Sequence, residues 1–248
     1  MNKILADYKN ECAKLFNRKK YYVFMAIEVL ICGIVILTKL LTNSLSKGAV
    51  SLDNISSALT LMTLFIEIII PFIVMMATCE MFSEEFQSKT IRAVFMRPIA
   101  RYKIYLGKYF AVLTLAVVNM LVVMLAANLM DLLIVGNLNN LGYSILAYII
   151  DIIPMMVLIM MAVMINQLVN NSTMSMFLCI IIYICLKLAG VYFTGLSGLV
   201  FTGYMQWHKL WLGAGMPVGT MISRIALLLG YGITFTSVGY YIFRFKEC

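Results

Sequence analysis

The chain has 248 residues, of which 63% are hydrophobic and 12% charged, and its formal net charge is +8. An ordinary soluble domain is about 45–50% apolar and about 25% charged. The composition therefore excludes a soluble globular protein, a disordered chain, collagen and a small disulfide scaffold. Because the basic residues lie beside long apolar stretches, they indicate a membrane topology and contact with anionic lipid, and they do not predict binding to nucleic acid.

Six stretches of mostly apolar residues are each long enough to cross a bilayer as an α-helix, which needs about 20 residues. They predict an all-α polytopic membrane protein in which residues 21–248 form a single transmembrane domain. No soluble domain fits between the spans. The expected spans are Tyr21 to Leu41, Ala58 to Cys79, Ile104 to Met130, Tyr143 to Asn166, Ser172 to Thr194, and Ile222 to Phe243.

The basic residues that flank the spans predict the orientation of the chain, because Lys and Arg concentrate on the cytoplasmic side of a membrane. They gather before the first span, between the second and third spans, and after the last span, whereas residues 131–142 contain none. We therefore expect both termini on the cytoplasmic side of the membrane. The flanking basic residues are Lys3, Lys9, Lys14, Arg18, Lys19, Lys20, Lys89, Arg92, Arg97, Arg101, Lys103, Lys108, Arg244 and Lys246.

Residues 1–20 have the pattern of an amphipathic helix that lies in the membrane interface. Apolar side chains recur at helical spacing, and the charged side chains are expected to turn elsewhere. Such a helix would anchor the first span and enforce topology, or it would transmit motion from a moving cytoplasmic partner. The apolar residues are Ile4, Leu5, Tyr8, Cys12, Leu15 and Phe16, and the charged ones are Lys3, Asp7, Lys9, Lys14 and Arg18.

Residues 80–101, between the second and third spans, have the signals of a separate cytoplasmic helix of about four or five turns. Ser83 is placed to cap it, Glu84 and Glu85 would lie near its positive end, and Pro98 would end it. The alternative is a basic loop that only sets topology. An i,i+4 pair joins Glu85 to Lys89, and the apolar side chains that share one face are Phe82, Phe86 and Val94.

The same segment resembles the coupling segment of ABC-2-type exporter permeases. The similar strings are Glu-Glu-Phe-Gln-Ser-Lys-Thr-Ile-Arg, Arg-Pro-Ile-Ala-Arg and Lys-Ile-Tyr-Leu-Gly-Lys-Tyr. Family members often have an acid, Gly-Thr, a few apolar residues, a Pro and an Arg before the third span. Lys89 stands where Gly is common, and a lysine is incompatible with any demand for a positive φ angle there. The matching residues are Glu85, Thr90, Arg92, Pro98 and Arg101.

The resemblance implies a non-catalytic membrane subunit that is driven by a separate ABC ATPase, with ATP and Mg bound in that partner and no cofactor or metal in this chain. It also implies a second permease copy or a paralogue, which would give twelve spans. Within the family the chain looks most like small permeases for antimicrobial or phenol-soluble-modulin-like peptides. The residues expected to couple to the ATPase are Phe82, Glu84, Glu85, Phe86, Lys89, Thr90, Arg92, Arg97, Pro98 and Arg101.

The connection before the last span, residues 195–220, is too apolar for free solvent and is broken by glycines. It resembles the re-entrant helical hairpin that family members place there, which closes the pathway from outside. The alternative is a helix that lies flat on the outer leaflet, with its two tryptophans in an aromatic belt. The candidate gate residues are Phe201, Trp207 and Trp211.

Four ionisable residues fall inside the predicted spans: Glu28, Glu67, Asp151 and Lys187. Such residues pair with one another or face a cavity, and they are candidates for the transport pathway. Because Asp151 and Lys187 are at similar depth, we expect them to form a pair. Glu67 lies one turn before Pro71, whose ring removes a backbone bond to the Glu67 carbonyl and predicts a kink. Whether Glu67 contacts substrate or pairs with Lys187 is left open.

Two other classes of protein compete with the exporter subunit. A secondary transporter or channel would use Glu67 and Lys187 in ion coupling, but the chain has no convincing internal repeat. An intramembrane enzyme is opposed by the single histidine, His208, and by the lack of a G-x-S-x-G motif. Within the ABC class, export of sodium, lipid or drugs stays open beside export of an amphipathic peptide.

Overall fold

A computed structural model describes residues 2–45, 57–91, 96, 99–135, 141–193, 195, 198–212 and 217–246. The described residues form helices and connecting turns, with no strand among them. In chain order the helices are α1 Asn2–Phe16, α2 Lys19–Leu45, α3 Ser57–Leu64, the π-helix η2 Phe65–Ile69, α4 Ile70–Cys79, the π-helix η3 Glu80–Glu84, α5 Glu85–Gln87, α7 Arg101–Val135, α8 Leu141–Leu168, α9 Ser172–Tyr192, the 3-10 helix η4 Phe201–Tyr204, α10 His208–Leu212 and α11 Val218–Phe245.

The prediction of an all-α protein with six spans is confirmed. Within the described ranges, six helices are long and apolar enough to cross a membrane. The second span extends further than expected, because α4 continues without a break through η3 and α5. The six candidate spans are Lys19–Thr38, Leu61–Gln87, Arg101–Met130, Leu141–Leu168, Ser172–Tyr192 and Val218–Phe245.

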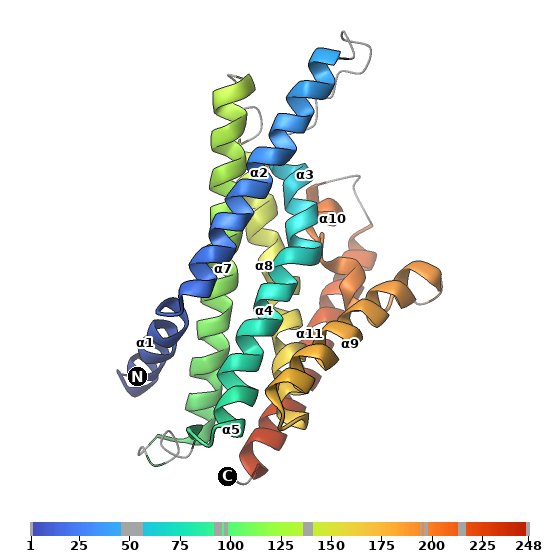
Figure 1. Ribbon diagram of the computed structural model, residues 1–248. Coiled ribbons are helices and arrows are strands. Elements are labelled where there is room, and N and C mark those ends of the chain that lie inside the picture. Colours follow the sequence, from blue (N-terminus) through green and yellow to red (C-terminus); the bar gives the residue numbers. More distant parts are fainter. Residues whose placement is uncertain are drawn as a thin grey trace.

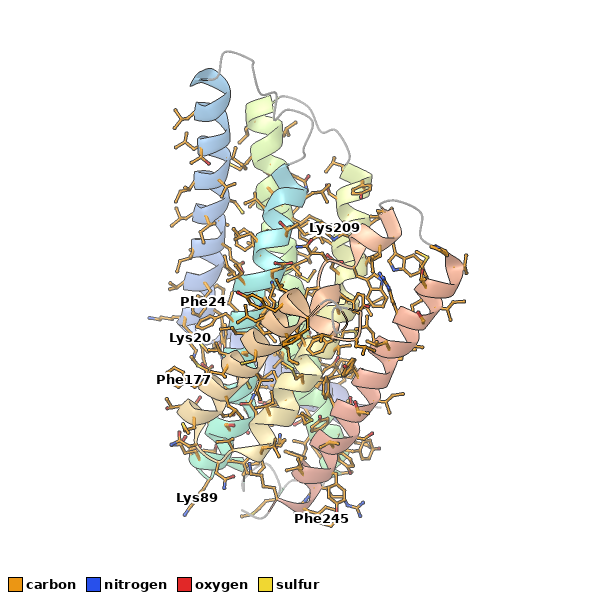
Figure 2. The ribbon with its side chains drawn as sticks, turned by 90° about the vertical axis from the view of Figure 1, so that its right-hand side faces the viewer. Lys20, Phe24, Lys89, Phe177, Lys209 and Phe245 are labelled. Carbon is orange, nitrogen blue, oxygen red and sulfur yellow. The ribbon has the colours of Figure 1, made fainter. Side chains whose placement is uncertain are left out.

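The two termini lie at the same end of the bundle, which we call the terminal end (Figure 1). Helix α1 lies at this end and packs against α7, and α8 runs through the middle, in contact with α4, α7, α9 and α11. The turn after α5 is also at the terminal end. Figure 2 shows Lys89 of this turn and Phe245 of α11 at the same end, with Lys209 of α10 nearer the opposite end.

Helices α2, α9 and α11 keep much of their apolar surface exposed. Side chains project outward from the bundle along these helices (Figure 2). In a protein that crosses the membrane, lipid or another protein must cover such faces. Large exposed side chains on these helices include Leu30, Ile34, Ile181, Val191, Ile222 and Ile233.

The described part of the connection before α11 packs against the bundle. Helix η4 contacts α8, α9 and α11, and α10 contacts α8. Phe201, Tyr204, Trp207 and His208 are buried, so this segment is held by the protein. We call residues 201–212 the gate segment.

Candidate pathway and coupling surface

A cluster of charged side chains joins α1 to α5 and α7 at the terminal end. Lys108 Nζ contacts Glu85 Oε2 at 2.7 Å and Glu11 Oε2 at 3.1 Å. Lys14 Nζ contacts the other oxygens of the same acids, at 2.6 Å from Glu11 and 3.2 Å from Glu85. The side chains of Lys108 and Glu11 are fully buried. We call these four residues the terminal clamp, because two lysines bridge two acids from different elements.

The pKa values of the α1 groups in the clamp move in opposite directions. Burial alone would raise the pKa of the Glu11 carboxyl, but Lys108 and Lys14 outweigh it and lower that pKa. Burial alone would lower the pKa of the Lys14 ammonium, but Glu11 and Glu85 outweigh it and raise that pKa. Both shifts favour the charged forms, so the clamp stabilises α1 on the bundle as a set of ion pairs.

A second group of ion pairs extends the clamp along the end of the second span. Arg18 contacts Glu80 at 2.9 Å and Glu84 at 3.2 Å. Glu80 also accepts a hydrogen bond from the Tyr21 hydroxyl at 2.7 Å and contacts Lys20. Glu84, which was expected to couple to an ATPase, therefore pairs with Arg18 in the turn between α1 and α2.

The expected orientation of α1 is wrong at its acidic residues. Asp7 was predicted to turn away from the apolar face, yet it is buried against α7, as is Glu11, for which no prediction was made. Leu5 is exposed. The physical reason lies in α7, where Lys108 supplies a counter-charge and Gly107 lets α1 approach closely, since a Cβ atom at Gly107 would meet the Asp7 carboxylate at 2.9 Å.

Ser83 does not cap a separate helix, and that expectation is wrong. It lies buried in η3, and its hydroxyl donates to the Asn166 carbonyl at 2.9 Å. Asn166 Nδ2 donates to Thr78 Oγ1 at 3.0 Å, so these groups tie the second span to α8. The cap pattern of Ser followed by two acids is thus used inside a continuous helix.

The predicted coupling residues divide into buried and exposed groups. Phe82 and Phe86 pack edge-on against Phe243 of α11, with ring centroids 6.2 and 6.0 Å apart. Glu84 and Glu85 make the ion pairs described above. Exposed residues begin at the last residue of α5 and continue after it, and we call residues 87–90 the coupling turn: Gln87, Ser88, Lys89 and Thr90.

Lys89 adopts a φ of 59°, in the left-handed region. The position where the resemblance implied a Gly thus has a positive φ, and the expectation that lysine is incompatible with it is wrong. The side chain of Arg101, at the start of α7, donates to the Arg244 carbonyl at 2.5 Å. Arg92, Arg97 and Pro98 lie outside the described residues, as does Val94.

The coupling turn is bonded to α9 as well as to the second span. The side-chain oxygen of Gln87 accepts a hydrogen bond from the Ser172 backbone N–H at 2.9 Å, at the start of α9. The Cys79 thiol donates to the Ser172 carbonyl at 2.9 Å. The end of the second span and the first residue of α9 therefore move together or break these bonds.

A second polar cluster lies deeper in the bundle, around Glu67. Its Oε2 atom contacts Lys187 Nζ of α9 at 2.7 Å, and its Oε1 atom accepts a hydrogen bond from Gln206 Nε2 at 2.5 Å. Its backbone carbonyl accepts a hydrogen bond from the Tyr183 hydroxyl at 2.7 Å. We call Glu67, Tyr183, Lys187 and Gln206 the Glu67 junction.

The backbone at the junction is irregular for a physical reason. Pro71 has no N–H and leaves the Glu67 carbonyl without its helical donor. The chain responds with a π-helix over Phe65–Ile69, in which the Ile70 N–H bonds the Phe65 carbonyl. The Tyr183 hydroxyl from α9 supplies the missing donor to Glu67. π-helical turns of this kind are frequent at functional sites.

A groove of about 670 Å³ opens beside the junction, between α2, the second span and α9. Among the described residues that line it, Glu67 and Lys187 are the only charged ones, and their side chains are 32% and 30% exposed. The other lining residues are mostly apolar and aromatic, including Phe24, Ile31, Phe72 and Ile184. The groove therefore presents one ion pair in an apolar surface.

The expected pair between Asp151 and Lys187 is wrong. Lys187 pairs with Glu67, and Asp151 instead holds the gate segment. Asp151 Oδ1 accepts the His208 backbone N–H at 2.7 Å, and Oδ2 lies 2.6 Å from Nδ1 of the same residue. Equal depth in the membrane does not place two helix faces opposite each other. The partner of Asp151 comes from the connection that precedes α11.

Glu28 is fully buried on α2, away from both clusters. Neither of its carboxylate oxygens has a hydrogen-bond partner in the part of the chain that the structure describes. Of the four intramembrane candidates, the structure thus brings together only Glu67 and Lys187.

The three gate candidates have different surroundings. Phe201 is buried and packs against Tyr231 and Phe235 of α11, with centroids 5.6 and 6.0 Å away. Trp207 is buried and Trp211 is 47% exposed. Both tryptophans line an apolar crevice of about 700 Å³ between α8 and α11.

Several partners in these clusters were not found from the sequence. His208 was considered only as a metal ligand, and within the described ranges no group of three or more His, Cys, Asp and Glu residues could hold a metal ion. Gln206, Tyr183, Glu11 and Lys108 were not linked to any site. Some of them could have been found from one signal, which is that each ionisable residue in a span requires a polar partner. The gate segment supplies two such partners, Gln206 and His208.

The comparison with protein families agrees with this architecture. The family model described as ABC-2 family transporter protein matches residues 8–190. The match includes α1 from Tyr8 onward, the second span with its coupling turn, and α9 up to Gly190. Among curated proteins, none matches the chain. The fold and the family define a multi-pass membrane transport protein, and the chain belongs to the ABC-2 transporter family.

Proposed function

We propose that this chain is the permease subunit of an ATP-driven ABC exporter. In this proposal it lies in a bacterial cytoplasmic membrane with both termini in the cytoplasm, a separate ATPase supplies the energy, and the cargo is an amphipathic or antimicrobial peptide. The observation that carries the proposal is the continuous second span. This one helix runs from the exposed coupling turn to the Glu67 junction, a separation of 20 residues, or about 30 Å of helix.

The coupling turn is the surface on which we place the ATPase. Its side chains are exposed, whereas the two acids that precede it are engaged: Glu84 with Arg18, and Glu85 with α1 and α7. Force applied to the turn would reach α9 through the bond between Gln87 and Ser172. It would reach α1 through the terminal clamp. In this proposal the coupling turn therefore connects the ATPase surface to three helices of the permease, namely the second span, α9 and α1.

A second copy of the chain, or a paralogue, completes the pathway in this proposal. The groove beside the Glu67 junction is open on one side, and the outer faces of α2 and α9 are apolar. Two such chains would place two grooves around one path. ATP-driven closure of the ATPases would then change which side of the membrane the path opens to.

The cargo is proposed from the composition of the groove. Apolar and aromatic side chains dominate its lining, with one ion pair at its wall. Such a surface fits an amphipathic molecule better than a polysaccharide, whose hydroxyl groups would lack partners. Sodium, lipid and drug export are the alternatives within the same class.

The proposal is tested by purifying the tagged chain from its native host in mild detergent and assaying the eluate for an ATPase. We expect a P-loop ATPase in roughly equal amount and ATP turnover in the eluate. The variant Lys89→Glu, in the coupling turn, is expected to lower ATPase recovery. Lys209→Glu is the matched control, because Lys209 is also exposed but lies nearer the opposite end (Figure 2).

Recovery of an intact chain without an ATPase and without turnover would contradict the exporter proposal and favour a secondary transporter. Equal loss of the ATPase in both lysine variants would contradict the docking site alone.

A further inference from the structure

The carboxylate of Glu67 is shared by two elements that come from different parts of the chain. One oxygen is bonded to Lys187 of α9 and the other to Gln206 of the gate segment, at 2.7 and 2.5 Å. Both bonds end on a single side chain. A group that takes over one oxygen of Glu67 therefore affects both partners.

The backbone at Glu67 is not held by a regular helical hydrogen-bond ladder. The π-helix at Phe65–Ile69 and the missing donor of Pro71 interrupt the regular backbone ladder at this residue. The Tyr183 hydroxyl bonds the Glu67 carbonyl in place of a backbone donor. Side chains from α9 and the gate segment thus hold the junction where a regular helix would hold itself.

The groove makes the junction accessible to a ligand. Glu67 and Lys187 are each about one-third exposed toward it, and the rest of its lining is almost entirely apolar. A ligand with an apolar body and a positive charge matches this surface, because its body covers the apolar lining and its charge meets the carboxylate. Lys187 has a long flexible stem that can extend toward the membrane surface when displaced.

We infer that Glu67 is a binding site for the cationic group of an amphipathic ligand, a primary ammonium or a guanidinium, and that its occupation releases the gate segment. The inference rests on the proposed function in that the ligand is the cargo. The incoming cation exchanges with Lys187 at Oε2. The carboxylate turns toward the incoming cation, and the hydrogen bond from the Gln206 amide breaks, because an uncharged donor holds the carboxylate less strongly than a cation does.

The release is local because a second attachment remains. His208, two residues after Gln206, stays bonded to Asp151 through its backbone N–H and its ring. Trp207 lies between the two attachments and is 3% exposed. Loss of the Gln206 bond therefore loosens the chain at Trp207 without removing α10 from α8.

Trp207 provides the readout, since the chain has only two tryptophans, Trp207 and Trp211. The full-length Trp211→Phe protein is placed in nanodiscs of phosphatidylcholine, and Trp207 emission and acrylamide quenching are followed during titration. The probe is dodecylamine, which carries an ammonium group at pH 7. Dodecanol, with the same chain and no charge, is the matched probe. We expect red-shifted emission and stronger quenching with dodecylamine only.

Variants separate the binding site from the gate. Glu67→Gln is expected to raise the midpoint of the dodecylamine response about tenfold or more, because a charge-assisted bond is lost. Glu28→Gln is the matched control, since Glu28 is another intramembrane acid that does not line the groove, and its response should be unchanged. Gln206→Leu leaves the ion pair intact and should give the released Trp207 signal without any probe.

An equal response to dodecanol, or a normal midpoint in Glu67→Gln, would overturn the inference. If Glu67→Gln does not fold, Glu67→Asp replaces it, because aspartate retains the charge on a shorter side chain. An unshifted dodecylamine midpoint in Glu67→Asp, together with a native-like Trp207 signal in Gln206→Leu, would also overturn the inference. If a second copy of the chain covers the groove, the Trp211→Phe protein would show no response to dodecylamine, and that result would also overturn the inference. No ATPase is used, so this result is independent of the purification test above.

Discussion

The terminal clamp and the Glu67 junction use the same chemistry in different surroundings. In both, a carboxylate from the second span meets a lysine from another helix, at 2.7 Å. In the clamp Lys108 is fully buried and every partner is charged, whereas in the junction both Glu67 and Lys187 are about one-third exposed and one partner is a neutral amide. The clamp therefore resists motion of α1, and the junction is able to exchange partners.

The largest effect is expected from removing the centre of the clamp. Lys108→Met leaves Glu11 and Glu85 close together with only Lys14 to neutralise them, and we expect the free energy of unfolding to fall by about 3–5 kcal/mol. Denaturant unfolding of the purified chain measures this loss. Lys9→Ala, an exposed lysine on the same α1, is the control and should change little. A small effect of Lys108→Met would show that the clamp does not hold α1.

The attachment of the gate segment to α8 gives the next largest effect. Asp151→Leu removes the acceptor of two hydrogen bonds from His208, and we expect a loss of about 2–3 kcal/mol with greater exposure of Trp207. Trp207 fluorescence in the Trp211→Phe background measures the exposure. Tyr143→Phe, which loses only a 3.3 Å bond to the Leu212 carbonyl, should have a much smaller effect. Equal effects would argue against a special role for Asp151.

A double-mutant cycle compares the pair that the structure contains with the pair that was expected from depth. Lys187→Leu and Glu67→Gln should show a coupling free energy of about 1 kcal/mol, as interhelical polar pairs in membranes do. Lys187→Leu and Asp151→Asn should be additive. Unfolding in the same detergent measures both cycles. Coupling to Asp151 instead of Glu67 would contradict the assignment of the junction.

Acid should weaken the clamp through Glu11. The folded-state pKa of this carboxyl lies below its ordinary value, so its contribution to stability is complete above about pH 4.5 and is lost as the pH falls through the folded-state pKa. Lys14 behaves oppositely, because its raised pKa keeps its contribution until the pH rises above about 10.5. Docking of α1, followed by a spin label there, should be constant between these limits. The acid step from this residue should be absent in Glu11→Gln.

The smallest effect concerns the coupling turn that leads to both clusters. Lys89 has a φ of 59°, so Lys89→Gly should relieve backbone strain and stabilise the chain by about 0.5–1 kcal/mol. Ser88→Gly is the matched control, since Ser88 has a φ of −80° and gains nothing from glycine. Thermal unfolding measures both. Destabilisation by Lys89→Gly would show that the lysine side chain makes a contact that outweighs the strain.

The spans were predictable because the length of an apolar stretch is a local property. The end of the second span was not predictable, because the pattern of Ser83 followed by Glu84 and Glu85 is compatible with two structures. It can cap a new helix, or it can continue an old one when Asn166, Arg18 and Lys108 supply partners. Only the packing of α8 and α1 against this segment decides between them.

For the candidate site, the sequence identified Glu67, Asp151 and Lys187 as groups that need partners, since charge is costly in a bilayer. It did not identify the partners of all three. Depth along a helix is one coordinate, and the direction in which a side chain faces depends on how neighbouring helices pack. Gln206 and His208 come from an irregular segment, where no periodicity predicts a direction.

The sequence by itself determined that this protein crosses the membrane six times as helices, that its charges lie mainly at one end, and that its second span leads into the segment that resembles the family. These follow from composition and local order, which act on each stretch of chain separately. Tertiary structure alone decided that α1 faces α7 with its acids, that Glu67 joins α9 to the gate segment, and that Asp151 binds His208. These contacts join residues far apart in the chain, and they exist because desolvated charges must find partners wherever the packed helices bring them.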